Sequence, residues 1–234
     1  MINLPYLISL ASYTSGVDRY LDSLKNLGNS AEWIPVVFDS ATWPHHLAET
    51  PSYRIDTPYP GHLYRFEYIP QDLDPDRWWI FTDTADVIFQ KPIPDLDGLG
   101  IEIWTAPESE THRNNGIWKG IIGQFPQAEK LLDTPIYNMG TWAMRGQKAL
   151  ELVQYLQDNR ASFNCHPNSD QLMYNLWLTE QPTEIVGVHP TLMVCLYANL
   201  EKGFVRKENG VFVNEAGQPF AITHANGNQK EWLA

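Results

Sequence analysis

Apolar and polar positions alternate regularly over the first forty residues. Residues 4–11 are a short apolar run, and a polar turn follows them. Gly28 and Asn29 end a helical pattern, and residues 33–38 form a second apolar run. The order predicts a strand, a helix and a parallel strand joined by a right-handed crossover. The apolar positions with the spacing of one helix face are Val17, Tyr20, Leu21, Leu24 and Leu27.

The rest of the chain continues this alternation. Residues 40–76 hold six prolines and predict loops around one short helix at 64–69. We expect one α/β domain over residues 1–234, with a mostly parallel central sheet flanked by helices. Further strands are predicted at 78–82, 87–89, 101–105, 135–144, 185–188 and 220–223. Helices are predicted at 128–132, 147–157 and 170–178, a surface loop at 107–118 and a hairpin at 205–213.

Composition and charge exclude two classes of partner. The chain has 16 basic and 28 acidic residues and a net charge of −12. Binding to a phosphate backbone depends on Lys and Arg, so we expect no nucleic-acid partner. No apolar run approaches the roughly 20 residues of a membrane span. Residues 1–11 lack a basic start and contain Pro5, so they predict a strand and not a signal peptide.

The two cysteines, Cys165 and Cys195, are too few for a disulfide framework. They leave two alternatives open, one bridge between them or two free buried thiols. We favour free thiols, which are typical of a reducing compartment, and therefore expect a cytoplasmic protein.

The clearest chemical signal follows the apolar run at residues 78–82. Asp83 and Asp86 lie directly after it, three residues apart in an Asp-x-x-Asp pattern. Ligands of open α/β sheets bind beyond the carboxyl ends of the strands. Two carboxylates there can hold a hard divalent cation, which can in turn bridge phosphates. The alternative is a simple turn in which Asp83 caps the strand end and Asp86 is solvated.

A second signal follows the predicted strand at residues 220–223. His224 is a possible metal ligand, and an imidazole beside carboxylates suits Mn²⁺ better than Mg²⁺. Gly227 permits close approach of the backbone to a ligand, and Lys230 offers a positive charge to a phosphate. The alternative is a loop that carries these residues by chance.

Two segments in the middle of the chain add polar groups. Asn138 and Gly140 interrupt an apolar strand, which indicates a bulge or close backbone approach. Asp170 and Gln171 open a predicted helix, where the helix dipole favours a carboxylate. Taken singly, each pair is explained slightly better by local capping or turn chemistry.

Taken in this order, these segments resemble the metal-dependent glycosyltransferases of the GT-A fold. The resemblance is to the glycosyltransferase domain of the procollagen lysyl hydroxylase/glycosyltransferase proteins, and it spans about residues 5–231. It implies a GT-A, Rossmann-like fold. The matching motifs are Asp83 to Val87, Ala106-Pro107-Glu108, Asn138-Met139-Gly140, Ser169-Asp170-Gln171 and His224 to Lys230, with a similar opening over residues 12–27.

The resemblance also implies a function. Asp83, Asp86 and His224 would ligate Mn²⁺ (or Mg²⁺), which would hold the diphosphate of a nucleotide-sugar donor, a UDP-sugar in our expectation. Lys230 would help to neutralise that diphosphate. The acceptor would be a glycan, a protein or a small molecule. The nucleoside would lie against Ala11, Ser12 and Tyr13, with Tyr13 as the stacking partner of the base. The sugar and acceptor side would be lined by Asn138, Gly140, Asp170 and Gln171.

The chemistry of sugar transfer assigns roles to two further carboxylates. The charge of the leaving group must be neutralised, by a divalent metal and a basic side chain. An inverting reaction also needs a base for the acceptor hydroxyl. Asp170 is the first candidate for that base and Glu108 the second. The chain departs from the family at Ser169, which replaces an acid, and at Met139, which replaces a small residue.

The sequence leaves three alternative functions. A non-catalytic module that binds a nucleotide sugar or glycan on the same fold is the main alternative. A phosphohydrolase of the HAD type would separate its two acids by one residue, whereas here the gap is two. A nucleotidyltransferase would carry a glycine-rich, arginine-bearing loop after the first strand, and residues 12–16 lack one.

Overall fold

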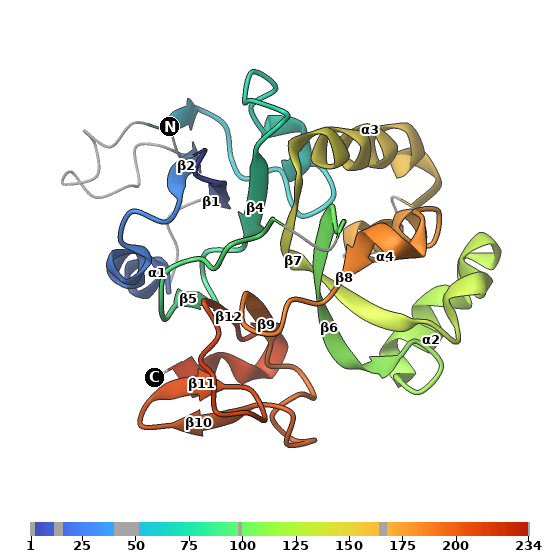
Figure 1. The fold of residues 1–234 in the computed structure, drawn as a ribbon. Helices are drawn as coiled ribbons and strands as arrows, with labels where there is room; N and C mark the ends of the chain where they lie inside the picture. The colour runs from blue at the N-terminus through green and yellow to red at the C-terminus, as the bar shows by residue number, and fades with distance from the viewer. Residues whose placement is uncertain (1–2, 12–15, 40–51, 98–99, 164–167, 234) are drawn as a thin grey trace.

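The protein is an α/β structure built on a mostly parallel central sheet (Figure 1). The computed structural model describes residues 3–11, 16–39, 52–97, 100–163 and 168–233, with only the backbone of 227–229. The described strands of the sheet have the order β3-β2-β1-β4-β7-β6-β8. Only β7 runs antiparallel to its neighbours β4 and β6. The strands are β1 (Tyr6–Ala11), β2 (Glu32–Phe38), β3 (Tyr53–Ile55), β4 (Trp78–Thr82), β6 (Ile103–Thr111), β7 (Pro135–Arg145) and β8 (Val186–Gly187).

The predicted strand-helix-strand unit at the start of the chain is confirmed. Helix α1 (Val17–Leu24) continues as a 3-10 turn, Lys25–Leu27, and joins β1 to the parallel strand β2. On its other side β1 pairs in parallel with β4. All six residues of β1 are buried because both faces of the sheet are covered. This explains why β1 is a continuous apolar run in the sequence.

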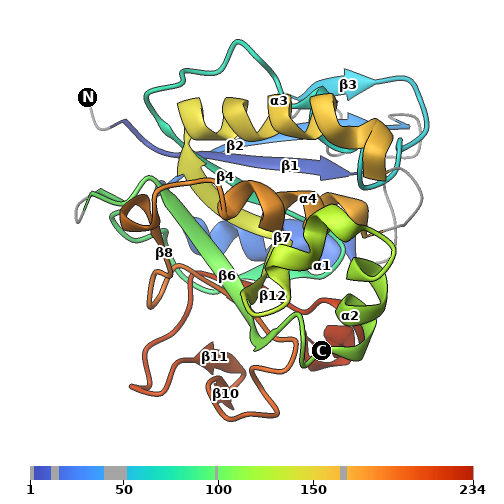
Figure 2. The same ribbon diagram turned by 90° about the vertical axis from the view of Figure 1, so that its right-hand side faces the viewer.

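Two layers cover the sheet. Helices α3 (Gly146–Phe163) and α4 (Ser169–Leu178) lie on one face, and α1 with a small second sheet lies on the other (Figures 1 and 2). The side chains of β4 alternate between the two cores. Trp79 and Phe81 pack with the α3 and α4 side, whereas Trp78 and Ile80 pack with α1 and the small sheet.

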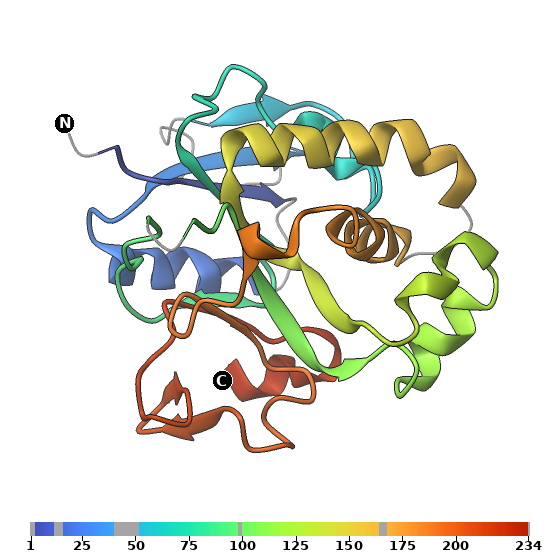
Figure 3. The same cartoon turned by 45° about the vertical axis from the view of Figure 1, so that its right-hand side comes forward.

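A small second sheet places the segment after β4 beside a strand from the end of the chain. It has the order β5-β12-β9, formed by β5 (Val87–Phe89), β12 (Ile222–His224) and β9 (Met193–Cys195). β12 runs antiparallel to β5, and His224 pairs with Val87. The segment after β4 therefore lies beside the end of β12. The predicted hairpin is confirmed as β10 (Arg206–Glu208) and β11 (Val211–Val213), which lies with the small sheet at the lower edge of the view in Figure 3.

The predicted surface loop at 107–118 is wrong. Strand β6 continues to Thr111, past an irregularity at Pro107, and helix α2 (Gly116–Ile122) begins five residues later. The Asn115 side chain caps α2 by accepting hydrogen bonds from the backbone N–H groups of Ile117 and Trp118, at 3.1 and 3.2 Å. The strand could not be recognised from its pattern because its second half is polar: Glu108 is buried in a polar site and not in an apolar core.

Other predicted elements are present with shifted bounds. The short helices at 64–69 and 128–132 are 3-10 turns, Arg65–Tyr68 and Pro126–Leu131, and a further one, Thr183–Ile185, precedes β8. Strand β3 was not predicted. Cys195 is a free, buried thiol, as expected, whereas Cys165 lies outside the described residues. None of the helices in the described ranges is long and apolar enough to cross a bilayer.

Candidate functional site

Asp83 and Asp86 occupy the short connection between β4 and β5. The connection is fixed by backbone hydrogen bonds at both ends. The Asp83 N–H donates to the Gly140 carbonyl at 2.7 Å, and the Ala225 N–H donates to the Asp86 carbonyl at 2.8 Å. The carboxylates are thus held at the carboxyl end of β4, between β7 and the segment that follows β12.

The start of α1 packs against the connection between β4 and β5. Gly16 has a φ of +99°, and a Cβ built on it would lie 2.2 Å from the Ala85 carbonyl oxygen. Only glycine fits this approach. Arg19 Nη2 donates to the same oxygen at 3.4 Å, and the Tyr20 hydroxyl lies 2.9 Å from Thr82 Oγ1. The first helix therefore fixes the loop that carries both aspartates.

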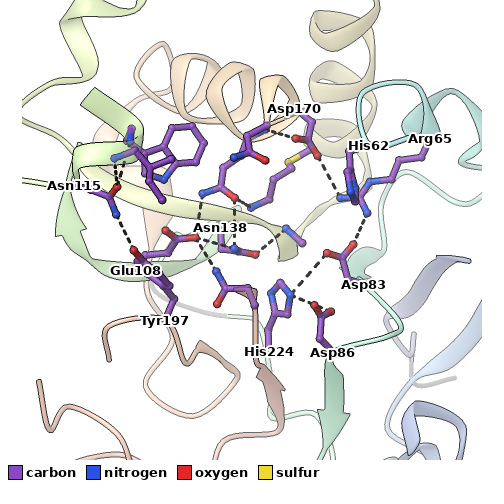
Figure 4. Close-up of a pocket in the computed structure, with 17 residues that line it drawn as sticks. His62, Arg65, Asp83, Asp86, Glu108, Asn115, Asn138, Asp170, Tyr197 and His224 are labelled. Carbon is purple, nitrogen blue, oxygen red and sulfur yellow. Dashed lines mark hydrogen bonds and ion pairs between the residues drawn. The ribbon is translucent and has the colours of Figure 1, made fainter. Parts of the chain in front are cut away.

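The structure brings the three predicted metal ligands together. One ligand atom each from Asp83, Asp86 and His224 lie within 4.8 Å of one another. His224 Nε2 is 3.3 Å from Asp86 Oδ1 and 3.8 Å from Asp83 Oδ2 (Figure 4). The His224 side chain is 2% exposed, and its Nδ1 is buried without a hydrogen-bond partner among the described residues. Two carboxylates and an imidazole fit a divalent transition metal such as Mn²⁺.

The electrostatics of this cluster favour its charged form. Burial raises the pKa of Asp86, but the hydrogen bond from His224 and the charges of His224 and Lys230 outweigh it, so that the pKa falls to about 2. Burial lowers the pKa of His224, but the hydrogen bond to Asp86 and the nearby carboxylates outweigh burial and raise it overall. Lys230 Nζ lies 3.3 Å from Asp86 Oδ2.

Gly140 on β7 makes room for the cluster. A Cβ at this position would lie 2.3 Å from Asp83 Oδ2 and 2.5 Å from His224 Cε1. The Gly140 N–H also donates to Asn138 Oδ1 at 2.8 Å. The close approach that the sequence pattern predicted at Gly140 is therefore present, and its reason is the packing of two candidate ligands against the bare backbone.

Arg65 is the most important site residue that the sequence did not reveal. Its side chain is only 3% exposed. Nη1 donates to Asp83 Oδ1 and, at 3.2 Å, to the Tyr59 hydroxyl, while Nη2 is 3.4 Å from Asp170 Oδ2. One guanidinium therefore joins the candidate metal site to the first candidate base.

Glu108 lies in a different environment, a cage of amides. Its Oε1 atom accepts hydrogen bonds from Asn138 Nδ2 at 2.9 Å, Gln171 Nε2 at 3.0 Å and Asn226 Nδ2 at 3.2 Å. Burial raises the pKa of Glu108, more than these bonds lower it. For Asp170 burial likewise raises the pKa and outweighs the charge of Arg65, and its Oδ1 accepts from the Gln171 N–H at 2.8 Å.

Two adjoining cavities share the two aspartates of the cluster. The first, about 310 Å³, runs from Asp83, Asp86 and His224 to the amide cage. The second, about 230 Å³, lies on the side of β1. His62, Arg65, Asp83 and Asp86 line both cavities. The first is also lined by Glu108, Asn138, Gly140, Asp170, Gln171 and His224, and the second by Ala11, Tyr59 and Lys230.

Most predicted site residues therefore line one of the two cavities. Ser12 and Tyr13 lie outside the described residues. Gly227 begins the 3-10 turn Gly227–Leu233, which carries Lys230. The other lining residues were not singled out one by one from the sequence. Asn226 lies inside the motif that begins at His224 and could have been suspected. The residues missed are Leu10, Tyr59, His62, Arg65, Thr84, Ala85, Asn115, Ile117, Trp118, Asn168, Tyr197 and Asn226.

Comparison with known proteins adds no relationship. No protein-family model matches the chain, and the curated proteins searched contain no match. The class that the described residues define is an α/β protein with a mostly parallel sheet and an Asp-Asp-His group that could hold a metal ion.

Proposed function

We propose that this protein is a metal-dependent glycosyltransferase of the GT-A type, which moves a sugar from a nucleotide-diphosphate donor to an acceptor hydroxyl. The observation that carries the proposal is the position of the Asp83, Asp86 and His224 cluster at the junction of two cavities. A donor of this class is itself two-sided. Its nucleoside and its sugar lie on either side of a diphosphate, which is the part that needs a cation.

The second cavity suits the nucleoside and diphosphate. Ala11 at the end of β1 and the ring of Tyr59 line it, and Lys230 stands at its edge. The Lys230 side chain is 54% exposed and already pairs with Asp86. It can turn from that carboxylate to a phosphate oxygen, because both are anions within reach of a flexible side chain. Mn²⁺, held by Asp83, Asp86 and His224, would supply charge neutralisation for the leaving diphosphate. A UDP-sugar is the donor that we propose.

The first cavity suits the sugar and the acceptor. Besides Asp83 and Asp86, two carboxylates line it, and their surroundings differ. Asp170 is tied to Arg65 and to the Gln171 N–H, whereas Glu108 has one oxygen held by three amides. In an inverting reaction either could accept the proton of the acceptor hydroxyl. Asp170 remains our first candidate, and Glu108 the second.

A non-catalytic binding module on the same fold is the second candidate function, and one observation favours it. Ser169 stands where the family has an acid, and its hydroxyl donates to the Phe163 carbonyl at the end of α3. The position therefore supplies a structural hydrogen bond and no charge to the pocket. Such a module would bind the donor without hydrolysing or transferring its sugar.

Thermal unfolding with nucleotide diphosphates and their sugars, in Mn²⁺ and in EDTA, tests the proposal. A ligand at about 100 times its Kd adds about 2.7 kcal/mol. For a chain of this size that is a rise in Tm of about 5–10 °C. We expect stabilisation by one nucleotide only when Mn²⁺ is present. A panel with no response to metal or nucleotide contradicts the proposal.

The Asp86→Ala variant sharpens this experiment. Removing one of three ligands should abolish the Mn²⁺-dependent rise in Tm and any sugar transfer. Asp133→Ala is the matched control, because Asp133 is exposed, pairs only with Arg113 at 2.6 Å among the ion pairs of the described residues, and lines neither cavity. Full activity of Asp86→Ala would remove this carboxylate from the metal site. Donor binding without hydrolysis or transfer in the unaltered protein would favour the binding module.

A further inference from the structure

The fork of Arg65 is the feature of the pocket for which the proposed function has no role. The guanidinium holds Oδ1 of Asp83 with one nitrogen and Oδ2 of Asp170 with the other. The other oxygen of Asp83, Oδ2, faces His224 Nε2 at 3.8 Å. The two oxygens of Asp83 therefore have separate partners, one a fixed cation and one the cluster. In Figure 4, Arg65 and His62 stand at the end of the pocket next to Asp83.

The surroundings of Arg65 make this arrangement rigid. Its guanidinium carbon lies 4.8 Å from the centre of the Phe66 ring and 5.1 Å from that of Phe81. Phe81 belongs to β4, the strand that ends at the connection carrying Asp83 and Asp86. A buried arginine is costly unless its charge is paired in good geometry. Here the pairing partners are the pocket carboxylates themselves, so the position of Arg65 and the positions of those carboxylates depend on one another.

We propose that Arg65 is a positioning residue that turns Oδ2 of Asp83 toward Asp86 and His224 and joins that orientation to Asp170. The proposal rests on the proposed function, because it assigns Arg65 to the metal site named there. Arg65 touches neither the metal nor the donor in this role. It acts through Asp83, as a partner of a metal ligand fixes the direction of that ligand.

Two effects of Arg65 on metal binding have opposite signs, which makes the proposal testable. As a nearby cation, Arg65 repels a divalent metal, and its removal would strengthen metal binding. As the partner that orients Asp83, it favours binding, and its removal would weaken binding about 10- to 100-fold. The proposal requires the second effect to be the larger.

The experiment measures Mn²⁺ affinity without donor, by isothermal titration calorimetry, for Arg65→Met and Arg65→Lys. Lysine keeps the charge but cannot hold two carboxylates with a planar fork. Both variants should therefore bind Mn²⁺ at least tenfold more weakly. Arg77→Met is the matched control. Arg77 pairs with Glu32 at 2.7 Å and lies over the Tyr6 ring at 3.5 Å, but it lines neither cavity. Its Mn²⁺ affinity should stay within about twofold, since none of its partners is a metal ligand.

The contact between Arg65 and Asp170 gives an independent readout. In Asp170→Asn the hydrogen bond from Arg65 to Asp83 remains, so the loss of Mn²⁺ affinity should be smaller than in Arg65→Met. In the double variant, Asp170→Asn should add nothing to the effect of Arg65→Met, because its contribution passes through the same guanidinium. Additive losses would overturn the link between the two carboxylates.

Each result decides the proposal. Unchanged or tighter Mn²⁺ binding in both Arg65 variants overturns the positioning role and leaves the proposed function intact. If Arg65→Lys alone keeps the wild-type Mn²⁺ affinity, the charge of Arg65 matters and its planar fork does not. This result also overturns the positioning role. An absence of Mn²⁺ binding in the unaltered protein overturns the metal-dependent function, and the role of Arg65 with it. Arg65→Lys keeps the test open if Arg65→Met does not fold, as circular dichroism would show.

Discussion

The two ends of the first cavity hold their carboxylates in opposite ways. At the metal end Asp86 is paired with charged groups, and its pKa falls to about 2. At the amide end the hydrogen bonds to Glu108 come from neutral amides, and burial raises its pKa. Charge-assisted hydrogen bonds therefore outweigh burial at Asp86, whereas the bonds from amides do not outweigh it at Glu108. The metal end includes an exposed charge, Lys230, whereas at the amide end neighbouring side chains supply the hydrogen bonds.

The difference separates two kinds of variant. Changes at the metal end should alter cation binding and leave the hydrogen-bond cage intact. Changes at the amide end should alter stability and sugar chemistry and leave cation binding unchanged.

Gly140→Ala should have the largest effect, on metal binding. The new Cβ would displace Asp83 Oδ2 and the His224 ring, which it would meet at 2.3 and 2.5 Å. Because two of three ligands must move, Mn²⁺ affinity should fall at least about 100-fold, at the upper end of the range for disturbed ligand shells. Calorimetric titration measures it. Gly120→Ala is the control, since no atom lies within 4 Å of its Cβ on α2. Equal Mn²⁺ affinity in both variants would contradict the assignment of the cluster.

Glu108→Ala should act on stability instead. Three amide groups lose their acceptor, and each unsatisfied donor costs about 1 kcal/mol or more, so unfolding should cost about 3 kcal/mol less. Urea denaturation measures this difference. Glu108→Gln keeps an oxygen in place and should lose less than about 1 kcal/mol. Mn²⁺ affinity should stay the same in both. A large fall in Mn²⁺ affinity would show that the two ends are not independent.

The pH dependence of Tm should change sign when Mn²⁺ is added. In the metal-free protein the raised pKa of His224 adds stability below its ordinary value of 6.5, and this is lost as the pH rises through the raised pKa. The lowered pKa of Asp86 adds stability above its ordinary 3.8, lost as the pH falls toward about 2. Mn²⁺ needs neutral imidazole, so its affinity should rise with pH. Tm measured across pH 5–9 in EDTA and in Mn²⁺ should diverge above about pH 6.5. Parallel curves would exclude His224 as a ligand.

The fold was predictable where elements bury continuous or periodic apolar faces. Strands β1, β2 and β4 were predicted within two residues at each end, because they bury continuous apolar runs. Helix α1 with its 3-10 turn was predicted because it buries one apolar face. The second half of β6 was missed since its residues face a polar pocket. Strand β3 was missed because it is three residues long and largely exposed at the edge of the sheet.

The grouping of Asp83, Asp86 and His224 was predictable, and the rest of the site only in part. Asp83 and Asp86 follow an apolar strand, and His224 ends another, so each has a local signal in the sequence. Arg65 has none. Its carboxylate partners lie 18 and 105 residues away along the chain, and Asn226 lies 118 residues from Glu108. Contacts of this kind arise only when the sheet and the small sheet are assembled.

Lys230→Ala should have the smallest effect and probes the boundary between the metal end and the second cavity. Its side chain is 54% exposed, so its pair with Asp86 adds less than about 1 kcal/mol to stability, and Tm should hardly change. If Lys230 turns to a phosphate, affinity for a nucleotide diphosphate in Mn²⁺ should fall about tenfold, the value of one charge-assisted hydrogen bond. Affinity for the nucleoside alone should not change, because it has no phosphate to contact. Equal losses for both ligands would place Lys230 against the nucleoside, and no loss for either would leave it outside the donor site.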